Sequence, residues 1–146
     1  MNSKELQAKL KPHKTSRKEI HDLLTIIERD LESAQVSKLS DDWQFSIAYN
    51  AARICCLIPL YCSGYRVPTN TPGQHYLTIE SLTFTMGSSY LKIKKYLNHC
   101  RMKRNKSDYD TAGLISPVDV KDLIQTANQL YEDIKNWLAI NYPEYL

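Results

Sequence analysis

The segment DDWQFSIAYNAARICCLIPLY, which runs from Asp41 to Tyr61, is the most apolar stretch of the chain. Apolar residues recur along it at the spacing of a helix face, and acidic residues stand at its start, where the helix dipole favours them. Ala48, Ala51 and Ala52 are small enough to let a neighbouring helix approach closely. We therefore predict a central helix over this segment, bent in its last turns by Pro59, which lacks a backbone donor.

Helical periodicity continues on both sides of this segment. Capping residues stand where the neighbouring helices should begin, at Thr15-Ser16 with Glu19, at Ser88-Ser89 and at Ser116-Pro117. The further helices are expected over Thr15 to Val36, Gln74 to Thr85, Tyr90 to Tyr109 and Ser116 to Pro143. Because the sequence has no strand alternation and no Gly-rich phosphate loop, we predict an all-α, up-and-down bundle of four to five helices.

The length of 146 residues suits one domain with a core of its own. We expect residues 15–146 to form this single helical domain and residues 1–14 to be a flexible N-terminal arm or a short helix. No apolar run approaches the roughly 20 residues that span a bilayer, and the first residues are polar. We therefore expect a cytoplasmic protein without a membrane partner.

The cysteines form no Cys-x-x-Cys pair, and their spacing suits neither a zinc site nor a secreted disulfide framework. They are Cys55, Cys56, Cys62 and Cys100. Three of them fall within an apolar helical pattern. We expect buried free thiols, no metal site and no cofactor.

The net charge of +3 is unevenly distributed along the chain. The segment from Lys92 to Lys106 contains seven basic residues and no acidic one, so the remainder of the chain carries a charge of −4. The seven are Lys92, Lys94, Lys95, Arg101, Lys103, Arg104 and Lys106. A basic helix on a mildly acidic body is suited to bind nucleic acid through its phosphates. A solvated helix face is the alternative interpretation.

The end of the basic helix, RMKRNKSDYD from Arg101 to Asp110, departs from an ordinary amphipathic pattern. At 100° per residue, its polar side chains continue the arc that carries the core-facing residues earlier in the helix. These polar residues are Arg101, Arg104, Asn105, Asp108 and Tyr109. Charges that face a core are costly unless they are paired or line a wet cleft. We therefore select this segment as the candidate site, with a structural ion-pair network as the alternative.

The same segment resembles a known family. Arg104-Asn105 followed by Asp108-Tyr109-Asp110, together with the segments 42–52 and 73–80, is similar to a small bacterial branch of the HEPN (higher eukaryotes and prokaryotes nucleotide-binding) superfamily. The superfamily motif has Arg, a polar residue and then His after four to six intervening residues. Here that window holds Tyr109, Asp110 and Thr111, and no His follows Arg104 at all.

The resemblance implies a two-fold dimer in which two copies of the motif line a shared groove. It also implies that the helix face with Tyr49 and Asn50 lines a cleft opposite Arg104. We expect such a domain to bind RNA or a nucleotide without efficient catalysis. The resemblance allows one alternative, a divergent metal-independent endoribonuclease acting as a toxin with a nucleotidyltransferase-type antitoxin. A second alternative is a non-catalytic protein-interaction module with no nucleic-acid role.

The chemistry of the motif supports binding better than catalysis. Guanidinium groups such as those of Arg101 and Arg104 bind phosphate oxygens in a bidentate manner. Asn105 can orient a hydroxyl or a phosphate, and Tyr109 can stack on a base. Asp108 beside arginines should be a poor proton acceptor. His75 could serve as a proton carrier from a neighbouring element, although we favour a helix-start residue with no such role.

Overall fold

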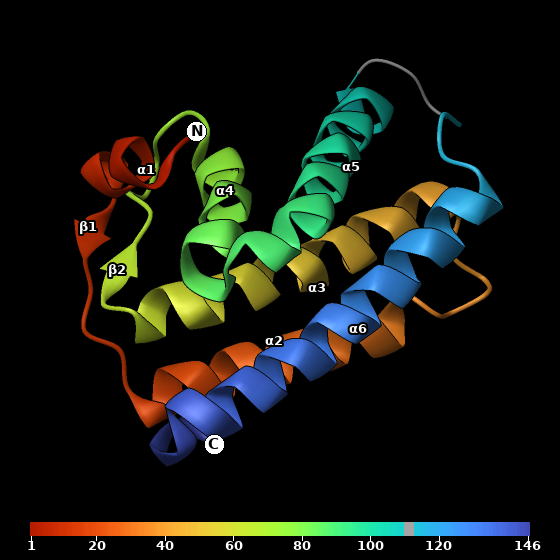
Figure 1. Cartoon of the computed structure of the whole chain (residues 1–146). Coiled ribbons are helices and arrows are strands. Elements are labelled where there is room, and N and C mark those ends of the chain that lie inside the picture. Colours follow the sequence, from red (N-terminus) through yellow and green to blue (C-terminus); the bar gives the residue numbers. More distant parts are fainter. Residues whose placement is uncertain (110–112) are drawn as a thin grey trace.

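The computed structural model is a helical bundle built around one central helix (Figure 1). It describes residues 1–109 and 113–146, except for the side chains of Asp108 and Tyr109. In chain order the elements are α1 (Ser3–Lys9), β1 (Lys11–Pro12), α2 (Arg17–Ser33), α3 (Asp41–Cys62), β2 (Tyr65–Arg66), α4 (Gln74–Met86), η1 (Ser88–Tyr90), α5 (Leu91–Tyr109), α6 (Pro117–Asn141) and η2 (Pro143–Tyr145). The predicted all-α class is confirmed.

The predicted central position of α3 is also confirmed. This helix packs against α2 and α6 on one side and against α4 and α5 on the other (Figure 1). Ala48, Ala51 and Ala52 are completely buried, so their small side chains let the neighbouring helices approach closely. The bundle core around α3 contains large buried side chains from five helices, among them Ile27, Phe45, Ile79, Leu97, Leu123 and Ile134. Hydrophobic burial of this kind is the main source of stability.

Capping residues begin the helices close to where the sequence predicts. The hydroxyl oxygens of Ser16, Ser40 and Ser116 each accept a backbone N–H from the first turn of the following helix, and such a cap contributes about 1 kcal/mol. At α6 the carboxylate of Asp119 completes a capping box by accepting the backbone N–H of Ser116. At α2 the carboxylate of Glu19 instead accepts from Thr15 and contacts His13, so the predicted box is incomplete there.

The N-terminal residues form the short helix α1 and pack against the bundle. Asn2 caps this helix through its side-chain oxygen. Leu6 and Leu10 are buried in a second apolar cluster, whose other buried members are Leu60, Val67 and Leu77. The strands β1 and β2 pair antiparallel and hold the chain after α1 against the segment that follows α3. Of the two expectations for residues 1–14, the short helix is therefore the one observed.

α3 has the length and apolar composition of a membrane-crossing helix, but 67% of its most apolar window is buried inside the bundle. A helix buried to this extent is the core helix of a bundle. Cys55, Cys56 and Cys100 are buried free thiols as predicted, and Cys62 is a free thiol with intermediate exposure. Burial raises the pKa of the Cys56 thiol to about 12, so this thiol stays protonated and unreactive at neutral pH.

Candidate functional site

α5 distributes its basic residues over several faces. Lys92, Lys95, Asn105 and Lys106 are exposed to solvent. Arg101, Lys103 and Arg104 are half-buried, and Lys94 is buried. The basic segment therefore forms no single phosphate-binding face. Asn105 is more exposed than Arg101 and Arg104, which the sequence predicts on the same helix face.

Lys94 has a structural partner rather than an open surface. Its Nζ lies 2.7 Å from Oε2 of Glu80, and both residues are almost fully buried, at 9% and 7% exposure. Burial would raise the pKa of the Glu80 carboxyl, but hydrogen bonds from Lys94 and Tyr76 outweigh it and lower that pKa. This ion pair joins α5 to α4. The assignment of Lys94 to a nucleic-acid-binding surface does not fit this position.

Lys103 also has a nearby carboxylate. Its Nζ lies 2.8 Å from Oδ2 of Asp119, the residue that completes the cap of α6. The pKa of Asp119 is lowered chiefly by the hydrogen bond from Lys103. This ion pair links α5 to the start of α6. Lys103 therefore stabilises the packing of the helices, although the sequence predicts it to bind nucleic acid.

The two arginines of the candidate segment, Arg101 and Arg104, are half-buried and contact aromatic rings. The guanidinium of Arg104 lies 5.2 Å from the centre of the Tyr49 ring on α3, and that of Arg101 lies 5.4 Å from the centre of the Tyr76 ring on α4. The contact with Tyr49 agrees with the predicted position of that residue opposite Arg104. Such cation–π contacts orient a guanidinium while leaving its N–H groups to other partners.

Arg53 on α3 adds a third guanidinium that the sequence analysis did not select. Its Nη2 donates to Oδ1 of Asn50 at 2.8 Å, and Nδ2 of Asn50 donates to Oδ2 of buried Asp30 at 2.7 Å. Arg29 donates to the other oxygen of Asp30. Burial lowers the pKa of Arg53, and Arg104 lowers it further. The network from Asp30 holds Arg53 near Arg104 although the two side chains repel each other.

The hydroxyl of Tyr49, whose ring lies under Arg104, feels the charges of all three arginines. Tyr49 is 1% exposed, and its oxygen has no hydrogen-bond partner among the described residues. Burial raises the pKa of Tyr49 to about 12, although Arg53, Arg104 and Arg101 oppose the shift. The phenol is therefore neutral at pH 7. A buried hydroxyl without a partner is uncommon because its desolvation is not compensated.

His75, near the start of α4, lies beside the same ring. Its imidazole centre is 6.1 Å from that of Tyr49. Burial, followed by the charges of Arg53, Arg104 and Arg101, lowers the pKa of His75 to about 4. The imidazole is consequently neutral at pH 7 and can accept a hydrogen bond or a proton. We call Tyr49, Arg53, His75, Arg101 and Arg104 the arginine cluster.

The arginine cluster combines residues from three helices. Because α3 lies under both α4 and α5 (Figure 1), it brings together the ends of segments that are distant in the sequence. Guanidinium groups beside a neutral imidazole are suited to bind a phosphoryl group. Among the described residues, no group of His, Cys, Asp and Glu is placed to hold a metal ion. The side chains of Asp108 and Tyr109, and the whole of Asp110 and Thr111, lie outside the described residues.

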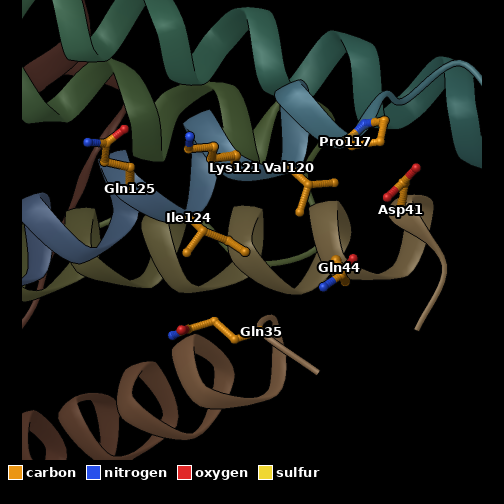
Figure 2. A pocket seen from close by; sticks show the side chains of 8 residues that line it. All are labelled: Gln35, Asp41, Gln44, Pro117, Val120, Lys121, Ile124 and Gln125. Atoms are coloured by element: carbon orange, nitrogen blue, oxygen red, sulfur yellow. The ribbon is translucent and has the colours of Figure 1, made fainter. Parts of the chain in front are cut away.

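Two surface pockets flank the start of α3. One, of about 410 Å³, adjoins the arginine cluster and is lined by Asp42, Trp43, Ser46 and Arg104. The other, of about 500 Å³, lies on the α2 and α6 side (Figure 2). Gln35 and Gln44 line that second pocket, and their amides donate to carbonyls near the end of α2. We therefore assign the second pocket to the helix packing and the first to the candidate site.

Part of the arginine cluster can be predicted from the sequence. Arg101 and Arg104 interrupt an apolar stripe, whereas Arg53 lies within the most apolar helix, where no local pattern indicates a site residue. The sequence favours a helix-start residue with no further role at His75. Comparison with known proteins adds no further guide, since no family model, curated protein or solved structure matches this chain.

Proposed function

We propose that the chain binds RNA or a nucleotide, with a phosphate held at the arginine cluster. The observation that carries this proposal is the position of Arg104 over the Tyr49 ring beside His75, with Arg53 and Arg101 near enough for their charges to lower the pKa of both groups. Guanidinium groups offer several N–H donors to phosphate oxygens, and their positive charges attract an anionic ligand. Exposed Lys92, Lys95 and Lys106 would supply weaker contacts to a longer RNA.

The proposal retains the HEPN-like interpretation of the sequence, and with it a cytoplasmic location and a two-fold dimer. The dimer interface would not come from Ala48, Ala51 and Ala52, because α3 buries these residues within its own bundle. Light scattering at micromolar concentration tests the dimer independently of ligand binding. A monomer at that concentration would remove this part of the proposal.

The test of binding uses a fluorescently labelled single-stranded RNA and a salt titration. We expect Arg104→Gln and Arg101→Gln each to weaken binding, and each to reduce the slope of log affinity against log salt by about 0.7. Arg17→Gln is the matched control, because Arg17 is an exposed arginine on α2. If all three variants lost affinity equally, the arginine cluster would not be the binding site.

A second candidate function, metal-independent RNA cleavage, is favoured by the position of His75. The neutral imidazole could accept the proton of a ribose 2′-hydroxyl while the arginines stabilise the charge on the phosphate. The 2′-oxygen would then bond to phosphorus as the bond to the 5′-oxygen breaks, and the imidazolium would return its proton to that oxygen, leaving a 2′,3′-cyclic phosphate and a 5′-hydroxyl. This is the function that a toxin paired with a nucleotidyltransferase-type antitoxin would have.

Incubation of the protein with RNA in excess EDTA separates the two candidates. Binding of RNA without cleavage supports the function of RNA or nucleotide binding. Cleavage that is lost in His75→Gln, and retained in the control His99→Gln, would establish the second. His99 is a suitable control because it is exposed on α5 and is not part of the arginine cluster.

A further inference from the structure

A chain of hydrogen bonds links the surface of α2 to the arginine cluster. Arg29 of α2, whose side chain is 65% exposed, donates from Nε and Nη2 to Oδ1 of Asp30 at 3.1 and 3.0 Å. Asp30 is buried, at 7% exposure, and its Oδ2 accepts from Nδ2 of Asn50 at 2.7 Å. Oδ1 of Asn50 accepts from Nη2 of Arg53 at 2.8 Å. Asn50 is therefore the link between a buried carboxylate and an arginine of the cluster.

The side-chain amide of Asn50 suits this position chemically. A carboxylate such as that of Asp30 only accepts hydrogen bonds, and a guanidinium such as that of Arg53 only donates them. The group between them must donate to the first and accept from the second, and an amide does both. These two neighbours also determine which way the amide points. An ionised carboxylate at this position could not donate to Asp30, and an apolar side chain could bond to neither neighbour.

The bond to Asn50 holds Arg53 in the absence of a ligand. Arginine has a long side chain with several rotatable bonds, and fixing such a side chain only when a ligand arrives reduces affinity. Because Asn50 is bonded to buried Asp30, the guanidinium of Arg53 is anchored to the packing of α2 on α3 (Figure 1). Supporting groups of this kind orient the residues that contact ligands in other binding sites.

We propose that Asn50 is a positioning residue of the phosphate site, which holds Arg53 ready to donate to a phosphate oxygen and is itself oriented by Asp30. The inference rests on the phosphate-binding function proposed above. Arg53 is half-buried and its Nε is buried, so the donors left for a phosphate are on its two Nη nitrogens. Asn50 and Asp30 act through Arg53 and do not contact the phosphate themselves.

The first test compares two variants at the two ends of this chain of bonds, with fluorescently labelled single-stranded RNA as the ligand. Asn50→Leu keeps a side chain of similar size but removes both bonds of the amide. We expect it to weaken RNA binding by about two- to tenfold, the effect of ordering one long side chain on binding. Arg29→Gln is the matched control. It removes the ion pair at the other oxygen of Asp30 and leaves the bonds of Asn50 in place, so RNA affinity should not change.

A double-mutant cycle shows whether Asn50 acts through Arg53. Arg53→Gln removes the guanidinium and should weaken RNA binding at least as much as Asn50→Leu does. In a protein that already carries Arg53→Gln, the further change Asn50→Leu should have no effect on affinity, because there is no guanidinium left to position. Weakening of the same size with and without Arg53→Gln would overturn the inference.

The pKa of His75 gives a second measurement that a general loss of packing would not reproduce. Burial lowers this pKa, and Arg53 is the first of the charges that lower it further. If Asn50→Leu releases Arg53, NMR titration should show the pKa of His75 rising toward its ordinary value. Arg29→Gln should leave it unchanged. An unchanged pKa of His75 in a folded Asn50→Leu protein would contradict the release of Arg53.

Nitrogen-15 NMR of the unmodified protein needs no folded variant of Asn50. The bond to Asn50 should slow rotation of the Arg53 guanidinium, so its two Nη nitrogens should give separate signals before any ligand is added. Arg17 is exposed and should give averaged signals. Arg53→Lys removes the Arg53 signals and so identifies them. Averaged Nη signals of Arg53 in the free protein would overturn the inference.

The outcomes also separate this inference from the proposed function. RNA binding that is weakened by Arg104→Gln but unchanged by Asn50→Leu would overturn the positioning role and leave phosphate binding in place. Absence of RNA and nucleotide binding by the unmodified protein would overturn both.

Discussion

The guanidinium of Arg104 lies 5.2 Å from the centre of the Tyr49 ring, which joins the last part of α5 to the first half of α3. Tyr49 is buried in the core, whereas Arg104 is half-buried and also lines a surface pocket. The ring therefore fixes the position of a charge that solvent and a ligand can still reach. This relationship makes the effect of replacing Arg104 on stability separable from its effect on binding.

Arg104→Ala should weaken RNA binding more than it weakens the fold. A cation–π contact at a partly exposed site is worth about 0.5–2 kcal/mol, so we expect the loss of unfolding free energy to include at least this contribution. The loss of a guanidinium–phosphate contact should reduce affinity by about tenfold or more. Urea denaturation and RNA titration measure the two effects. A destabilisation of about 3–5 kcal/mol without a change in affinity would instead place Arg104 in a structural ion-pair network.

Tyr49→Phe should have the opposite effect on stability. The substitution removes a buried hydroxyl that has no hydrogen-bond partner among the described residues and keeps the ring beneath Arg104. Removing an unsatisfied polar group is expected to be neutral or to stabilise the fold by about 1 kcal/mol. Destabilisation by more than about 1 kcal/mol would show that the hydroxyl has a partner in solution.

The helices of this chain could be predicted because they depend on local signals. Serine caps, apolar periodicity and the small residues of α3 locate the elements within a few positions of those observed. Where an observed element differs from the predicted one, tertiary contacts are the reason. α1 is held in place by the burial of Leu6 and Leu10 against residues from three later segments, which a local pattern cannot show.

The candidate site could be predicted only in part, because its residues meet through the fold. Arg101 and Arg104 break an apolar stripe and so can be found from periodicity. Arg53 and His75 come from other helices, and nothing in their local sequence indicates that they share a site with Arg104. Lys94 is predicted to contact nucleic acid but is paired with Glu80. The sequence cannot show this pairing, because it depends on how α4 packs on α5.

Lys94→Met should destabilise the protein far more than Lys95→Met. Lys94 and Glu80 form a buried ion pair, and removing the lysine leaves a carboxylate without its counter-charge at a cost of about 3–5 kcal/mol. Lys95 is exposed on the same helix, so its replacement should change the unfolding free energy by less than about 0.5 kcal/mol. Adding Glu80→Met to Lys94→Met should recover part of the loss. Equal small effects of both lysine variants in urea denaturation would contradict the buried pair.

The unfolding free energy should depend on pH through His75. The pKa of this imidazole is lowered from 6.5 to about 4 in the folded protein, so between these values the unfolded chain binds a proton that the folded chain does not. Stability should therefore be full above about pH 6.5 and decrease as the pH falls toward 4. Allowing for the partial exposure of the ring, the decrease should be on the order of 1–2 kcal/mol.

His75→Gln isolates this effect, because the difference between its pH profile and that of the unmodified protein removes the contributions of other groups. Glu80 and Asp119 have lowered carboxyl pKa values and therefore affect stability mainly below about pH 4.5. The interval from pH 5 to 6.5 reports mainly on histidines. Parallel profiles in that interval would show that His75 titrates normally. A phosphate bound among Arg53, Arg101 and Arg104 should raise the pKa of His75, and NMR titration with and without inorganic phosphate would measure that shift directly.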